Sequence, residues 1–151
     1  RLDSIQAAVL RAKLPNLDTY NDARRLAASK YAKAFQGIDG VITPGCFCEC
    51  SIENKEKCNL HVYHQYTLKI LNADRDALAA HLNENGIPCG VYYPIPLHLQ
   101  KAYLDDRYKE ENFKVTNQLI KEVISLPMHT ELEDEQIDFI TSTVINFLKN
   151  N

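Results

Sequence analysis

Two tyrosines and a histidine beside two prolines are the residues of this sequence best suited to bind a ligand. Tyr92 and Tyr93 stand immediately before the first proline, and His98 follows the second by two positions. The prolines donate no sheet hydrogen bonds and hold the preceding backbone extended. A helix expected over residues 97–104 then places His98 in its first turn, where free N–H groups favour an anion. This stretch predicts a wall for an anionic ligand, and the alternative is a rigid turn with two interface tyrosines.

A second group of residues could bind a metal ion. It consists of Cys46, Cys48, Cys50, Cys58, His61 and His64. Structural zinc sites usually space their paired cysteines roughly two to four residues apart, whereas alternate cysteines spread their sulfur atoms along an extended chain. We therefore expect free thiols and no metal site. Metal binding and redox sensing by exposed thiols remain the alternatives.

The composition argues against several other classes of function. With 45% hydrophobic and 25% charged residues, the 151-residue chain has the profile of a soluble globular domain. A net charge of −3 argues against nucleic acid as a partner, and no apolar run is long enough for a membrane span. An odd count of five cysteines and no visible secretory signal predict a cytoplasmic protein. The sequence also lacks a nucleophile elbow, a phosphate-binding glycine loop and paired catalytic carboxylates.

Amphipathic helices must hold these groups in place. Apolar residues at helical spacing predict helices over residues 2–12 and 17–35, and a third stripe runs over residues 137–148. Acidic residues 133–135 are expected to begin that last helix rather than to bind a metal. A further helix with Leu78 on its apolar face should end before Gly86. The basic residues of the second helix are expected to face solvent: Arg24, Arg25, Lys30 and Lys33.

The strongest strand pattern covers residues 61–71, which are rich in aromatic and branched side chains. Its alternation places His64 on the apolar face together with Tyr66 and Leu68, as a core histidine or, alternatively, a ligand-binding one. Weaker strand patterns occur at residues 41–43 and 125–127. Together the patterns predict an α+β fold in which a small antiparallel or mixed sheet is covered by helices and preceded by long N-terminal helices.

Five segments resemble, in the same order, the DegT/StrS family of pyridoxal-phosphate-dependent sugar aminotransferases. They are residues 1–8, 61–66, 75–88, 92–100 and 125–129. The resemblance covers nearly the whole chain apart from the cysteine-rich loop. It implies the C-terminal part of a fold-type I enzyme.

The resemblance also implies a domain organisation and the location of the catalytic lysine. Residues 1–35 would be helices linking from a preceding large domain, and residues 36–151 would be the C-terminal small domain. The Schiff-base lysine of the family would lie upstream of Arg1. None of the lysines in the sequence is expected to take its role, so the chain alone should be inactive.

By the same resemblance, several residues would contact ligands across a homodimer interface. Arg1 would reach the pyridoxal phosphate of the neighbouring subunit, because a guanidinium holds a phosphate by two hydrogen bonds. Tyr92, Tyr93 and His98 would line the sugar-nucleotide pocket, and His64 is placed with them as a substrate-binding residue. Many relatives carry histidine where Tyr92 stands.

The full enzyme would then transfer an amino group from glutamate to a nucleotide-linked keto sugar, for cell-surface polysaccharide or antibiotic sugars. The stretch from Tyr93 to His98 resembles relatives that act on 3-keto sugars. Three alternatives stay open. They are a sugar-nucleotide dehydratase of the same family with histidine in place of the lysine, a non-catalytic nucleotide-sugar binding module, and a thiol or metal module at the cysteines.

Overall fold

The computed structural model describes residues 3–45 and 61–150 of the chain. Three antiparallel strands form a sheet in the order β1-β2-β3: β1 (Val41–Ile42), β2 (Tyr66–Ile70) and β3 (Val123–Leu126). The α-helices are α1 (Ser4–Lys13), α2 (Leu17–Ala34), α3 (Arg75–Glu84), α4 (Lys114–Glu122) and α5 (Asp134–Asn150). The predicted α+β class is confirmed, and the sheet is antiparallel rather than mixed.

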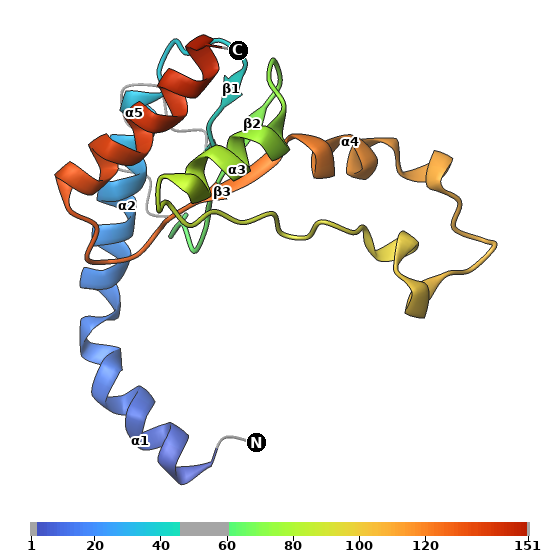
Figure 1. Cartoon of the computed structure of the whole chain (residues 1–151). Coiled ribbons are helices and arrows are strands. Elements are labelled where there is room, and N and C mark those ends of the chain that lie inside the picture. The colour runs from blue at the N-terminus through green and yellow to red at the C-terminus, as the bar shows by residue number, and fades with distance from the viewer. Residues whose placement is uncertain (1–2, 46–60, 151) are drawn as a thin grey trace.

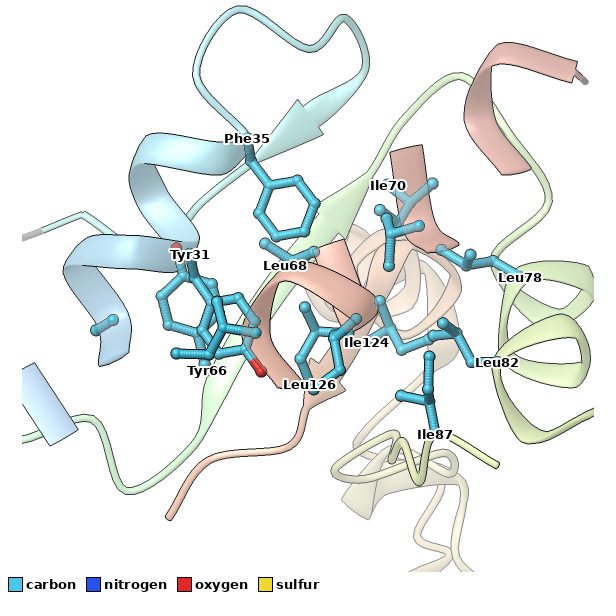
Figure 2. Packing of buried hydrophobic residues seen from close by; sticks show 14 of the residues in the cluster. Tyr31, Phe35, Tyr66, Leu68, Ile70, Leu78, Leu82, Ile87, Ile124 and Leu126 are labelled. Carbon is cyan, nitrogen blue, oxygen red and sulfur yellow. The ribbon is translucent and has the colours of Figure 1, made fainter. Parts of the chain in front are cut away.

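Strand β2 is the centre of the sheet and carries the core. Its residues Tyr66, Leu68 and Ile70 are buried, and they alternate with partly exposed Thr67 and Lys69. Helices α2, α3 and α5 supply the other side of the core (Figures 1 and 2). The fully buried side chains of the core are Tyr31, Phe35, Tyr66, Leu68, Leu78, Leu82, Ile124 and Val144.

The helices begin and end where local chemistry favours it. The Asp74 carboxylate accepts hydrogen bonds from two free N–H groups at the start of α3. The same helix is followed by Gly86 at a φ of 71°, which a residue with a Cβ adopts only with strain. Asp134 and Glu135 stand in the first turn of α5, as the sequence predicted.

The C-terminal half of helix α2 packs into the common core. Ala27, Ala28 and Tyr31 on α2 and Phe35 just after it are buried in the common core. Before it, a 3₁₀ turn over Leu14–Asn16 joins α2 to α1. Helix α1 has no buried residue and leads away from the sheet (Figure 1). The apolar side chains of α1 therefore contribute nothing to the core described here.

The prediction that the basic residues of α2 face solvent is wrong for three of them. Arg24 donates hydrogen bonds to backbone carbonyls of Tyr63, His64 and Met128. Arg25 donates to the carbonyl of His61, and Lys30 is paired with Asp134 at the start of α5. These contacts join α2 to segments far along the chain, which helical periodicity cannot reveal.

The arginine contacts also explain why β2 begins later than predicted. Residues 61–65 lie outside the strand, and Tyr63 has a positive φ of 50°. Because their carbonyls are bound by Arg24 and Arg25, these residues run beside α2 instead of pairing in the sheet. His64 is consequently exposed, and its predicted place on the apolar face of the strand is wrong.

A long arm, residues 91–113, leaves the sheet after Gly90 and returns through α4 (Figure 1). The helix predicted over residues 97–104 is absent from it. Two separate 3₁₀ turns, Leu97–Leu99 and Lys101–Tyr103, stand there instead, and another covers Glu110–Phe113. Turns this short carry little aligned dipole, so the predicted helix N-terminus at His98 is also wrong.

Candidate functional site

The base of the arm is fixed to the free edge of strand β3. Gly90 and Ser125 exchange two backbone hydrogen bonds, with N···O distances of 3.1 and 2.7 Å. Ser125 is buried, and its hydroxyl lies 2.8 Å from the hydroxyl of Thr67 on β2. The chain that enters the candidate site is therefore held by the sheet up to Gly90.

Two tyrosines follow directly at the start of the arm. The side chains of Tyr92 and Tyr93 are 56% and 76% exposed, and their rings meet edge to face with centroids 6.3 Å apart. Exposed phenol rings beside each other offer flat faces and two hydroxyl groups to a polar ligand. A Cβ atom placed on Gly90 would lie 2.7 Å from the ring of Tyr92. Tyr92 is therefore seated directly over the backbone of Gly90.

His98 lies deeper in the arm and is 8% exposed. Its ring stacks on Phe113, with centroids 4.3 Å apart and planes at 19°. Among the residues that the structure describes, its Nε2 atom is buried without a hydrogen-bond partner. A buried imidazole nitrogen normally finds a partner, so this atom is suited to a group supplied from elsewhere.

His64 is not brought together with the three residues of the arm. Tyr66 at the start of β2 pairs with Leu126 at the end of β3, and His64 precedes it. The bridge of Gly90 to Ser125 is antiparallel, so the chain after Gly90 runs towards the opposite end of β3. The sheet register thus directs His64 and Tyr92 to opposite ends of the strand.

The remaining predicted ligand-binding residues lie outside the described residues. These are Arg1 and the four clustered cysteines, Cys46, Cys48, Cys50 and Cys58. Of the cysteine-group histidines, His61 accepts a hydrogen bond from the backbone of Tyr63, and His64 is exposed. Over residues 3–45 and 61–150, His, Cys, Asp and Glu form no group that could hold a metal ion.

No lysine in the described part of the chain has the surroundings of a Schiff-base residue. All of these lysines are at least partly exposed, and Lys30 and Lys69 are paired with carboxylates. The amine of a Schiff-base lysine is usually desolvated in a buried pocket. These residues therefore do not fit the lysine site of a pyridoxal phosphate enzyme.

Other titratable groups belong to the core rather than to the site. Burial raises the pKa of the phenols of Tyr31 and Tyr66 well above the ordinary value. Burial likewise raises the pKa of the Cys89 thiol, which makes it a poor nucleophile.

No helix in the described residues is long and apolar enough to cross a membrane.

Sequence reasoning missed two features that shape the site. Arg24 ties the segment before β2 to Met128 after β3, and only the folded contacts show it. The ring of Tyr92 packs directly on the backbone of Gly90. The sequence did carry a signal for this contact. A glycine at the end of a strand often marks a close approach of another group.

Comparisons with known proteins identify a family and several relatives of this chain. The sequence profile of the DegT/DnrJ/EryC1/StrS aminotransferase family matches residues 1–145. A pleiotropic regulatory protein of Geobacillus stearothermophilus is 37% identical, over 99% of this chain and 38% of its own length. The UDP-N-acetyl-3-dehydro-alpha-D-glucosamine 3-aminotransferase of Acidithiobacillus ferrooxidans is 39% identical, over 95% and 35%.

Solved structures give the same result. The structure of S. venezuelae DesV is 30% identical and superimposes with a TM-score of 0.85, over 99% of this chain and 37% of that one. The chain therefore spans little more than a third of the length of the proteins it matches.

Proposed function

The chain belongs to the DegT/DnrJ/EryC1/StrS aminotransferase family, and on this premise we propose that it is the C-terminal part of a sugar aminotransferase. The whole enzyme would use pyridoxal phosphate to convert a nucleotide-linked keto sugar into an amino sugar, with glutamate as amino donor. The Acidithiobacillus relative is named for amino transfer to carbon 3 of a UDP-sugar. Together with the stretch from Tyr93 to His98, this name favours a 3-keto sugar as the substrate.

The observation that carries the proposal is the exposed pair Tyr92 and Tyr93 on an arm anchored to the sheet. Aromatic rings bind the apolar faces of sugars, and phenol hydroxyls bond to sugar oxygens. We assign this pair to the wall of the sugar pocket. Their exposure supports the assignment because a structural role in this chain would bury them.

His98 is kept in the proposed site for a different reason. Its Nε2 is buried, and no described residue provides a hydrogen-bond partner. We propose that the partner belongs to the substrate or to the rest of the enzyme. His98 would thereby both hold the arm through Phe113 and contribute one hydrogen bond to the pocket.

We propose a division of labour between this chain and the remainder of the enzyme. Pyridoxal phosphate, when bound, supplies the electron sink that aminotransferases need. Because the described lysines do not fit its site, we place the catalytic lysine in the part of the protein that this chain does not cover. This chain would bind and orient the sugar and exclude water from it.

A homodimer is part of the proposal. Exposed apolar side chains occur along α1 and along the arm, including Ile5, Val9, Tyr93, Leu97 and Tyr103. Large apolar surfaces of this kind usually mark contacts with other protein surfaces. We propose that a second subunit and the rest of the enzyme cover them, and that the protein works in the cytoplasm.

An assay of amino transfer tests the proposal. Full-length protein incubated with a UDP-3-keto sugar and ¹⁵N-glutamate should yield a labelled amino sugar, detected by mass spectrometry. The 151-residue chain with added pyridoxal phosphate should yield none. A product that has lost water and carries no ¹⁵N would identify a dehydratase, and labelled product from the chain alone would contradict the division of labour.

A further inference from the structure

Gly90 stands where any side chain would collide with Tyr92. A Cβ atom at Gly90 would lie 2.7 Å from two ring atoms of Tyr92 and 2.8 Å from its hydroxyl oxygen. Carbon atoms in contact prefer about 3.5–4.0 Å, so the ring occupies the space that a Cβ would fill. The phenol end of Tyr92 thus rests on the backbone of Gly90.

The backbone of Gly90, under the ring, is held by hydrogen bonds to the sheet. Gly90 is bound to Ser125 by two backbone hydrogen bonds. Ser125 lies within β3, paired with Thr67 of β2 through the strand register and through the contact of their hydroxyls. The position of Gly90 is therefore set by the sheet rather than by the arm.

Tyr92 differs in this respect from its neighbour Tyr93. Both rings are more than half exposed, and they touch each other edge to face. Tyr92 alone has its ring directly over a glycine of the sheet edge. Holding an exposed aromatic ring in one position before the ligand arrives reduces the entropy that binding must overcome.

We propose that Gly90 is a positioning residue of the sugar pocket: its lack of a side chain allows Tyr92 to lie on the sheet edge and to present its free face to the sugar. The inference rests on the proposed function, in which Tyr92 belongs to the pocket wall. A side chain at residue 90 displaces the ring of Tyr92 and weakens binding of the nucleotide sugar. Gly90 itself does not touch the substrate.

The test is a double-mutant cycle in the full-length enzyme, comparing Gly90→Ala, Tyr92→Leu and the double variant. Gly90→Ala should raise KM for the nucleotide sugar about tenfold because the displaced ring of Tyr92 no longer contacts the sugar. The value of kcat should change less than about twofold. KM for glutamate should stay unchanged. In the Tyr92→Leu background, Gly90→Ala should have no further effect because the ring it displaces is gone.

Gly45→Ala is the matched control. A Cβ at Gly45 meets nothing within 4 Å, and its φ is outside the positive range. This variant should leave KM for the nucleotide sugar as it is. Melting temperatures of all variants report whether the fold is kept.

The outcomes separate the two proposals. If Tyr92→Leu leaves KM unchanged, the pocket wall itself is refuted. If Tyr92→Leu raises KM but Gly90→Ala does not, or if the two effects add, only the role of Gly90 is overturned. If Gly90→Ala prevents folding and the added Tyr92→Leu substitution restores it, the packing of the Tyr92 ring on Gly90 is confirmed. If the double variant fails to fold as well, glycine is needed at residue 90 for the backbone itself and not for the position of Tyr92, and the inference is wrong.

Discussion

The imidazole of His98 lies almost flat on the ring of Phe113, with centroids 4.3 Å apart. The stack joins the two ends of residues 99–112 and closes them into a loop. Exposed apolar residues of this loop, such as Tyr103 and Leu104, make no part of the core. This contact and the Gly90–Ser125 bridge therefore both help the arm to keep its shape.

Phe113→Ala should loosen the arm and leave the sheet and the helices packed on it folded. Removing the stack costs roughly 0.5–1.5 kcal/mol of local stability. Amide hydrogen exchange in residues 99–112 should accelerate by up to about tenfold, while exchange in β2 and β3 stays the same. Phe139→Ala, which removes a half-exposed ring from α5, is the control. Unchanged exchange in the loop would show that the stack does not hold the arm.

Arg24→Ala should destabilise the whole domain. Arg24 donates to three carbonyls, two in the segment before β2 and one in the segment after β3, at 3.2–3.3 Å. Losing these bonds to a charged group should lower the free energy of unfolding by roughly 1.5–3 kcal/mol in a urea titration. Arg24→Lys should recover only part of it, because the ammonium lacks the planar guanidinium fork.

Lys33→Ala on the same helix is the control for Arg24, because Lys33 is exposed near the end of α2. It should change the free energy of unfolding by less than about 0.5 kcal/mol. Equal effects of the two alanine variants would mean that the carbonyl contacts of Arg24 do not stabilise the fold.

Cys89 should react slowly with alkylating reagents in the folded protein. Burial raises the pKa of its thiol, so a smaller fraction is thiolate at any given pH. The rate of iodoacetamide labelling at Cys89, followed by peptide mass spectrometry, should rise at a higher pH than in the urea-unfolded chain. Identical pH profiles in the two states would contradict this.

Two tyrosines, Tyr31 and Tyr66, should ionise at a higher pH than an ordinary phenol when the folded protein is titrated with alkali. Burial raises the pKa of Tyr31 and Tyr66, and the Tyr31 hydroxyl also donates to the carbonyl of Pro127. The folded state therefore holds these protons after the unfolded state has lost them near pH 10. Their contribution to stability is complete below that pH and is lost as the pH rises through the raised pKa.

Absorbance at 295 nm measures this titration. The double variant Tyr31→Phe/Tyr66→Phe should lose the late phase. A late phase that survives the double substitution would show that other tyrosines are the protected ones.

The long helices were predictable from the sequence because their signals are local. The apolar stripe of α5 through Ile137, Ile140 and Val144 is buried as expected, and α3 ends before Gly86. Strand β1 also lies where its short pattern indicated, at Val41–Ile42. In each case residues within one or two turns decide the structure.

The site was less predictable because long-range contacts decide it. The alternation over residues 61–71 favoured one long strand, but hydrogen bonds from Arg24 and Arg25 keep the first five residues out of the sheet. His64 therefore lies outside the strand and is exposed, not on the apolar face predicted for it. The choice between an antiparallel and a mixed sheet depended on pairs such as Thr67 and Ser125, 58 residues apart.

The segment after Pro96 was also predicted wrongly from the sequence. Leucine and alanine favour a helix over residues 97–104, yet only 3₁₀ turns form. The burial of His98 against Phe113 fixes this segment in a more extended path. Tertiary packing overrides a short helical preference, because a helix of two turns has little stability of its own.

A crystal structure of the full-length enzyme with a nucleotide-linked amino sugar tests the central claim most directly. The claim predicts the sugar ring in contact with the exposed face of Tyr92, within about 4 Å, with Tyr92 still seated on Gly90. A sugar bound away from residues 90–98 in every subunit would contradict it.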